Sequence, residues 1–64
     1  TGENFVDFLN NTRIEKSKEL LLNTDKKMYS IAKAVGYDNT KYFFRIFKKK
    51  TGITPEQYRL QHRK

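Results

Sequence analysis

Apolar residues recur every three or four positions along most of this chain, and that spacing marks one face of an α-helix. The first such stretch lies within residues 4–23, where Asn4 is suited to cap a helix that continues through about Leu22. The spacing predicts a long helix with a wide buried face. The apolar residues that define this face are Phe5, Phe8, Leu9, Ile14, Leu20 and Leu21.

Residues 23–27 contain turn formers and no apolar side chain, so they predict a surface connection. A helix of about two turns is expected next, and Gly36 is expected to end it as a left-handed cap. Ala32 is small enough to let a partner helix approach closely. The predicted buried face of this second helix comprises Met28, Ile31, Ala32 and Val35.

A third helix is predicted to begin with Asp38 as its N-cap and to end at Gly52. Its aromatic run is best explained by packing first, with Tyr42 and Phe44 at the edges of the apolar stripe. The helix therefore has one buried and one basic side. The buried side is predicted to hold Phe43, Ile46 and Phe47, and the other side Lys41, Arg45 and Lys48.

The last helix has the clearest boundary. Thr54 supplies a capping hydroxyl, Pro55 stands at the first helical position, and Gln57 can complete a capping box. This pattern predicts a helix over residues 55–62. The chain has 64 residues, of which 36% are hydrophobic, so it is expected to form one small all-α domain that buries about 60% of its unfolded surface.

Charge is distributed unevenly. Residues 1–24 carry three basic and four acidic side chains, whereas residues 25–64 carry eleven basic and three acidic ones. The C-terminal part is therefore expected to face a polyanion, because basic side chains near phosphates displace condensed counterions. Arg13 lies within the apolar face of the first helix and needs a partner there. Three roles stay open for Arg13: a structural ion pair, a side chain whose stem is buried while its charge reaches the surface, or a phosphate contact.

An enzyme is not expected. The chain has one His, no Cys and no glycine-rich phosphate loop, so the sequence predicts no catalytic residue, no cofactor and no metal site. Without Cys it also lacks disulfides and thiolate zinc sites. The competing interpretation is a basic helical module that binds an anionic membrane surface or RNA without sequence preference. Regular caps and glycine stops favour a folded domain over one long amphipathic helix at a membrane.

The chain resembles the C-terminal DNA-binding domain of AraC/XylS-type bacterial transcription regulators, including two-component response regulators that carry this domain as their output. The resemblance rests on apolar, glycine and basic positions along nearly the whole chain. These are Thr1, Gly2, Phe5, Leu9, Arg13, Ile14, Lys18, Leu20, Leu21, Ile31, Ala32, Val35, Gly36, Tyr37, Tyr42, Phe43, Phe47, Lys48, Gly52, Thr54, Pro55, Tyr58 and Arg59.

That family's domain holds two helix-turn-helix units joined by a long helix, in a homeodomain-like arrangement. The resemblance therefore implies that residues 1–2 are the tail of the first unit and residues 4–23 the linker helix. Residues 28–50 would be the complete second unit, followed by the C-terminal helix over 55–62. It also implies a larger bacterial cytoplasmic protein with a first helix-turn-helix unit and a sensory or receiver domain. A homodimer of that full-length protein stays open.

The family's second recognition helix corresponds to Asn39 through about Lys50, and it would read double-stranded DNA in the major groove. The resemblance implies base contacts by Thr40, Lys41, Tyr42 and Arg45. Packing alone stays open for Tyr42, and a solvated or phosphate-binding role for Arg45. We assign phosphate contacts to Asn39, Lys48, Lys49, Tyr58 and Arg59. Two positions depart from the family's usual pattern. Phe44 stands where the family has a small or polar residue. Two roles therefore stay open for Phe44: it could contact thymine methyls, or it could pack against the first helix-turn-helix unit. Lys27 occupies the place of a capping hydroxyl, so the second helix is expected to fray at its start.

Overall fold

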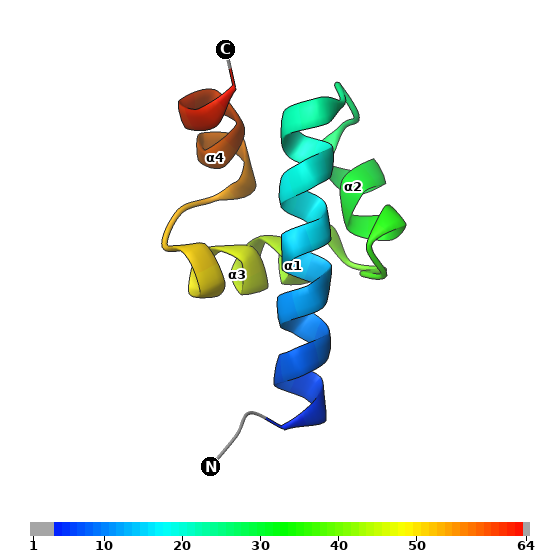
Figure 1. Cartoon of the computed structure of the whole chain (residues 1–64). Coiled ribbons are helices and arrows are strands. Elements are labelled where there is room, and N and C mark those ends of the chain that lie inside the picture. Colours follow the sequence, from blue (N-terminus) through cyan, green and yellow to red (C-terminus); the bar gives the residue numbers. More distant parts are fainter. Residues whose placement is uncertain (1–3, 64) are drawn as a thin grey trace.

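The computed structural model describes residues 4–63, which form four α-helices and no strand (Figure 1). Helix α1 covers Phe5–Asn23, α2 Met28–Ala34, α3 Thr40–Thr51 and α4 Pro55–His62. The prediction of an all-α fold with a long first helix and three shorter ones is confirmed. Residues Thr1 and Gly2, predicted to be the tail of a preceding unit, lie outside the described part of the chain.

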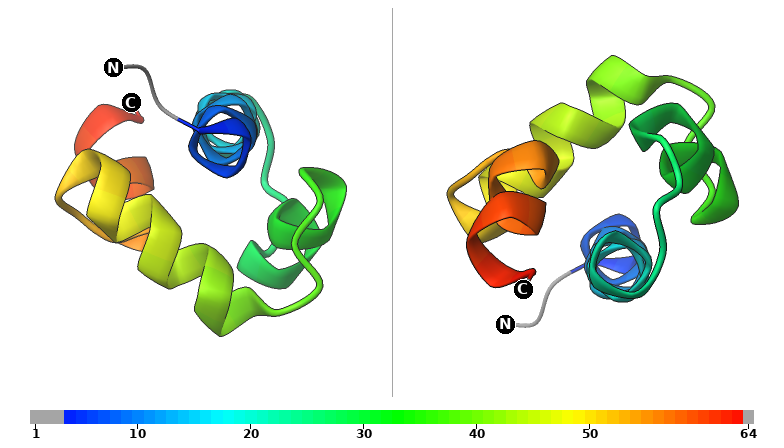
Figure 2. Two further views of the ribbon diagram at one scale, coloured as in Figure 1. Left: turned by 90° about the horizontal axis from the view of Figure 1, so that it is seen from below. Right: turned by 90° about the horizontal axis from the view of Figure 1, so that it is seen from above.

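Helix α1 is the axis of the molecule. Figure 2 views it end-on, with α2 and α4 on either side and α3 running from the α2 side to the α4 side, opposite α1. The first two turns of α1 project beyond the other helices, which gives the molecule its elongated extents of 38 × 22 × 18 Å (Figure 1). One side of α3 faces the core, and its other side faces away from α1.

The core forms where α1, α2 and α3 meet. Phe43 and Phe47 of α3 are fully buried and contact each other edge to face, with ring centroids 5.9 Å apart. Since an aromatic side chain can bury about 150 Å² or more, these rings supply much of the apolar burial of so short a chain. The predicted packing of α2 is confirmed, with Met28 at the edge of the core. The remaining buried apolar residues are Ile14, Leu21, Ile31, Ala32, Val35, Tyr37 and Ile46.

The buried face of α1 differs from the predicted one. Phe5 and Phe8 were expected in the core, but they are 74% and 59% exposed, because the N-terminal end of α1 projects beyond the other described helices (Figure 1). The predicted burial of Ile14 and Leu21 is confirmed, but the buried stripe is completed by Asn10 and Ser17. These residues follow helical spacing, but two of them are polar, so hydrophobic periodicity alone could not identify the stripe.

Helix α2 ends in a Schellman motif. The Tyr37 amide donates to the Ala32 carbonyl at 2.8 Å and the Gly36 amide to the Lys33 carbonyl at 3.1 Å, which satisfies two terminal carbonyls. Gly36 has the positive φ of 109° that this motif requires, as predicted. At the other end of α2, the Lys27 side chain makes no capping hydrogen bond, and the expected fraying of this end stays a prediction.

Helix α3 begins one residue later than predicted. Asn39, not Asp38, is its N-cap, and the Asn39 Oδ1 accepts from the Lys41 amide at 2.8 Å and the Tyr42 amide at 3.2 Å. Both residue types cap helices well, so composition could not decide between neighbours. At its C-terminal end, Gly52 ends the helix as predicted, and it does so in the left-handed conformation, with φ of 89°.

The predicted capping box of α4 is confirmed. The Gln57 amide donates to Thr54 Oγ1 at 3.1 Å, and the Thr54 amide donates to Gln57 Oε1 at 3.0 Å, with Pro55 at the first helical position. Within residues 4–63, no helix combines the length and the apolar character that a membrane crossing requires.

Candidate nucleic-acid interface

The outer side of α3 is basic along its whole length. Lys41, Arg45, Lys48 and Lys49 are all exposed, opposite the buried Phe43 and Phe47. Arg45 follows Lys41 by four positions, and Lys48 and Lys49 follow Arg45 by three and four. Lys49 lies eight positions after Lys41, which is about 12 Å along the helix, close to the width of the DNA major groove of about 12 Å. The structure thus places two of the four predicted base-contact residues and two of the predicted phosphate contacts on one continuous face.

The other two predicted base-contact residues lie in the first turn of α3. Thr40 is partly buried at the first helical position, directly after the capping Asn39. Tyr42 is 43% exposed, and its ring contacts that of Tyr37 edge to face at 5.6 Å between centroids. Asn39 uses its side-chain oxygen to cap the helix, so it holds the first turn whether or not it also meets a phosphate.

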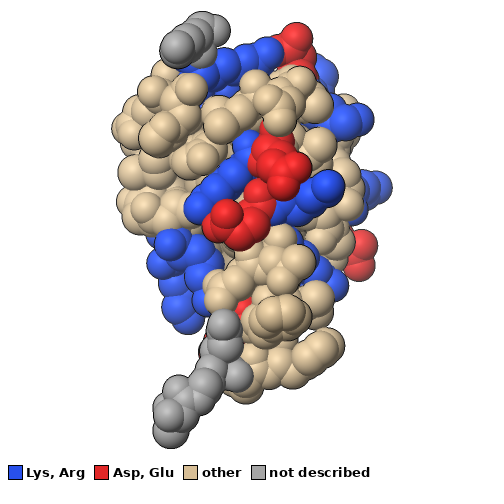
Figure 3. Space-filling model, in the orientation of Figure 1, with Lys and Arg blue, Asp and Glu red and all other residues tan. Residues whose placement is uncertain are grey.

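Helix α3 itself contains no acidic side chain, although the exposed Asp38 lies just before its N-cap. The helix carries five basic residues. The exposed acids of α1 pair with lysines on the same helix, Glu15 with Lys18 at 2.8 Å and Glu19 with Lys16 at 4.0 Å. Figure 3 shows acidic side chains at the centre of the α1 side of the molecule, and a cluster of basic side chains at lower left, where Figure 1 has the C-terminal end of α3. The outer face of α3 therefore carries a positive potential, which attracts the phosphate backbone of a nucleic acid.

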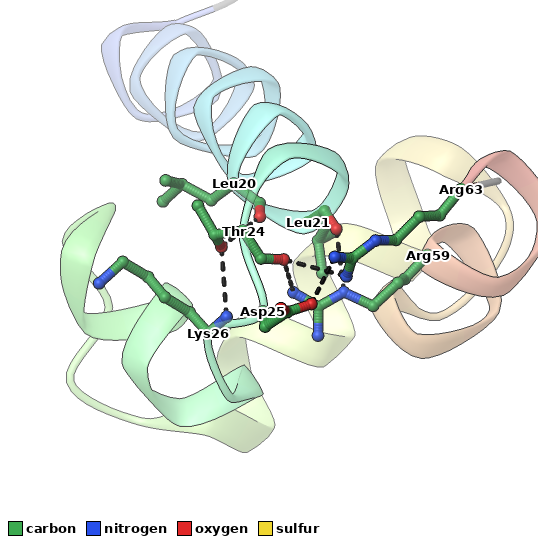
Figure 4. Close-up of polar contacts among 7 residues, drawn as sticks. All are labelled: Leu20, Leu21, Thr24, Asp25, Lys26, Arg59 and Arg63. Carbon is green, nitrogen blue, oxygen red and sulfur yellow. Dashed lines mark hydrogen bonds and ion pairs between the residues drawn. The ribbon is translucent and has the colours of Figure 1, made fainter.

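Two arginines of the α4 region bind the C-terminal end of α1 (Figure 4). Arg59 donates from Nε to the Leu21 carbonyl at 2.9 Å and from Nη2 to the Thr24 carbonyl at 3.0 Å. Arg63 donates from Nη1 to the same Thr24 carbonyl at 3.1 Å and pairs with Asp25. The last turn of α1 has no basic residue, so these guanidinium groups supply the positive charge that stabilises a helix C-terminus. Whether Arg59 also reaches a phosphate stays a prediction.

Two aromatic residues near this surface are engaged within the fold. The Tyr58 ring lies between Phe47, at 5.5 Å, and His62, at 4.4 Å between centroids. Phe44 is partly buried and contacts Phe43 edge to face at 6.0 Å. Each ring thus contributes to packing, and their proposed DNA contacts stay predictions.

Arg13 contacts an aromatic ring. Its guanidinium carbon lies 5.3 Å from the centroid of the Tyr37 ring, in a cation–π arrangement. The Tyr37 hydroxyl donates to Asn10 Oδ1 at 2.7 Å, and both residues are buried. Burial raises the pKa of Tyr37, an effect that the nearby Arg13 charge opposes and the nearby Tyr42 reinforces.

Sequence reasoning assigned no role to Asn10, to the Tyr37 hydroxyl or to Arg63. For Tyr37 a signal was available, since it directly follows the glycine of the turn. Asn10 and Arg63 gave none, because their partners lie 27 and 38 or more residues away in the sequence.

Residues 1–61 match the model of a protein family described as a helix-turn-helix domain. Two solved structures share the fold. The C-terminal domain of the response regulator AraT from Geobacillus stearothermophilus is 43% identical, with a TM-score of 0.95, over 98% of this chain and 52% of that one. The C-terminal domain of the response regulator yesN from Fusobacterium nucleatum is 50% identical, with a TM-score of 0.88, over 91% of this chain and 56% of that one.

A curated relative, the bifunctional transcriptional activator/DNA repair enzyme AdaA of Bacillus subtilis, is 40% identical over 58 residues. These are 91% of this chain and 28% of AdaA, so the chain spans just over half of the two solved relatives and under a third of AdaA. The family match covers nearly the whole chain, and the predicted resemblance is confirmed. The chain belongs to the AraC/XylS-type family of helix-turn-helix domains, which bind DNA in transcription regulation.

Proposed function

We propose that this chain binds double-stranded DNA at preferred sequences, with the outer face of α3 in the major groove. The observation that carries the proposal is the continuous exposed row of Lys41, Arg45, Lys48 and Lys49, opposite a buried aromatic face. A helix held in this way by a preceding helix and turn can present its side chains to base edges.

Base reading is assigned to the N-terminal half of α3. Arg45 is the strongest reader, since a planar guanidinium can bond to guanine O6 and N7 together, worth about 1–3 kcal/mol of discrimination. Lys41 can contact the same acceptors, but its flexible ammonium discriminates less sharply. Thr40 offers a hydroxyl or a methyl, and the exposed ring of Tyr42 can meet a thymine methyl.

Phosphate contacts are assigned to the C-terminal half of α3. Lys48 and Lys49 are exposed there, and contacts to the backbone fix the position of the protein without reading sequence. Asn39 is assigned to a phosphate at the start of the helix. Arg13 is not included, because its guanidinium lies against Tyr37.

The chain is further proposed to be the DNA-binding part of a larger bacterial regulator that acts in the cytoplasm. Its relatives are longer proteins, of which it spans about half or less. A preceding helix-turn-helix unit and a sensory or receiver domain would then supply further affinity and the response to a signal. No enzymatic activity is assigned to residues 4–63.

The test begins with selection of bound sites from a randomised duplex pool. Fluorescence anisotropy then measures the affinities of Arg45→Ala and Lys49→Ala for the selected duplex and for duplexes with single base-pair changes. Arg45→Ala should flatten the preference at one position, by about tenfold or more. Lys49→Ala should weaken binding to every duplex by a similar factor, because a phosphate contact carries no sequence information.

If both variants lose affinity equally on all duplexes, Arg45 does not read a base. The same assay with RNA and with anionic lipid vesicles examines the competing function. If the chain binds duplex, RNA and vesicles alike, with no preferred sequence, the basic face is a generic polyanion surface and the proposal fails.

A further inference from the structure

We propose that Tyr37 is a positioning residue for DNA recognition, which anchors the start of α3 to α1 and orients Tyr42 toward the groove. This inference rests on the proposed function of α3. It adds a residue that touches no DNA but sets the geometry of one that does.

The anchor is a buried polar contact between distant parts of the chain. The Tyr37 hydroxyl donates to Asn10 Oδ1 at 2.7 Å, and the two residues are 3% and 7% exposed. Asn10 lies on the rigid stripe of α1 that continues through Ile14. A buried hydroxyl with one partner is strongly held, because leaving it unpaired would cost its full desolvation. The turn between α2 and α3 is therefore attached to α1 at a defined point.

The Tyr37 ring is also confined on its faces and edges. Arg13 of α1 lies over it at 5.3 Å, and Phe43 of α3 lies beside it at 5.7 Å between centroids. Its remaining aromatic neighbour is Tyr42, which stands edge-on at 5.6 Å with an interplanar angle of 69°. Tyr37 thus separates the interior of the fold from Tyr42 on the surface.

Tyr42 depends on this contact for its direction. It lies in the first turn of α3 and is 43% exposed, and its ring rests against Tyr37, which contacts the buried Phe43. An exposed tyrosine can adopt several rotamers, and a fixed neighbouring ring favours one of them. If the Tyr37 ring shifts, the Tyr42 ring loses its edge-to-face contact and can adopt other rotamers.

The decisive variant is Tyr37→Phe, which removes the hydroxyl and keeps the ring. The position read by Tyr42 is first identified as the base pair at which Tyr42→Ala flattens the preference of the full-length protein. Tyr37→Phe should lower discrimination at that same base pair by about three- to tenfold, the equivalent of one lost hydrogen bond. The double variant Tyr37→Phe, Tyr42→Ala should show no further loss there, because both changes act through one contact.

Two further variants separate positioning from stability. Asn10→Ala removes the acceptor from the α1 side and should flatten the same base pair. Ser17→Ala is the matched control, since Ser17 is a buried residue of α1 whose hydroxyl donates to its own helix, to the Ile14 carbonyl at 2.7 Å. It should lower the unfolding temperature without changing sequence preference. All affinities are measured well below each variant's unfolding temperature, with circular dichroism as the check of folding.

The outcomes distinguish this inference from the proposed function. If the unaltered protein prefers a sequence but Tyr37→Phe and Asn10→Ala change only stability, Tyr37 is a structural residue and the inference is overturned. It is also overturned if Tyr42→Ala flattens no position. If the unaltered protein shows no sequence preference at all, the proposed function itself fails, and the inference fails with it.

Discussion

Position 36 requires a glycine for two reasons, its backbone conformation and the space available for a side chain. The Gly36 φ of 109° lies in a region that L side chains rarely adopt. In addition, a Cβ at this position would lie only 2.9 Å from Arg13 Nε. Gly52 meets only the first requirement, since its φ is 89° but nothing lies within 4 Å of the place where its Cβ would be. The two glycines therefore form a natural pair for separating backbone strain from side-chain crowding.

We expect Gly52→Ala to lower the free energy of unfolding by about 1–2 kcal/mol, through backbone strain alone. Gly36→Ala should cost about 0.5–1 kcal/mol more, because the new methyl group must displace the Arg13 guanidinium from the Tyr37 ring. Urea unfolding monitored by circular dichroism measures both values. In an Arg13→Ala background the excess cost of Gly36→Ala should shrink, and an undiminished excess would argue against crowding by Arg13.

At the scale of the helices, the four N-caps are unequal. Asn4, Asn39 and Thr54 each accept backbone amide hydrogen bonds, whereas Lys27 at the start of α2 offers no side-chain acceptor. Helix α2 has only seven residues, yet it braces α3 through Ile31 and Ala32. The amide groups of its first turn have no side-chain acceptor, so a single capping substitution can increase stability there.

We expect Lys27→Ser to raise the free energy of unfolding by about 0.5–1 kcal/mol, because the hydroxyl can accept from an amide of the first turn of α2. Chemical denaturation without DNA measures the change. Lys26→Ser is the control, since it also removes one exposed lysine but stands one residue too early to cap. Equal effects of the two variants would attribute the change to charge and not to capping.

For the molecule as a whole, positive charge is densest along α3. This helix carries five basic residues and no acidic one, whereas Glu15 and Glu19 of α1 pair with Lys18 and Lys16 of the same helix. A polyanion should therefore be attracted most strongly to α3, and the net charge of +7 understates the local potential there.

We expect the logarithm of the DNA-binding constant to fall with the logarithm of salt concentration with a slope of about −3 to −5, which corresponds to three to five phosphate contacts. Anisotropy titrations over a range of salt concentrations give this slope. Lys49→Ala should reduce its magnitude by about one. Lys16→Ala, an exposed lysine on α1, should leave it unchanged, and an equal reduction by both variants would show that net charge alone governs binding.

Local signals were sufficient for much of the fold. The capping box of Thr54 and Gln57, the proline start of α4 and the glycine ends of α2 and α3 were all predicted, because each depends on residues within about four positions of one another. The basic outer face of α3 was also predicted, since helical periodicity alone separates Arg45 from Phe43 and Phe47. Asp38 and Asn39 are adjacent and both suit an N-cap. The prediction of Asp38 was wrong, because Asn39 caps α3.

The helices, most of their ends and the positive charge of the outer face of α3 thus follow from the sequence alone, because these depend on neighbours along the chain. Tertiary packing was needed to bring Asn10 and Ser17 into the buried stripe of α1, to leave Phe5 and Phe8 exposed, and to join Asn10 to Tyr37. It also assigned Arg59 and Arg63 to the end of α1. These contacts join residues 27 to 39 positions apart, so they depend on how the helices pack and not on any pattern within one of them.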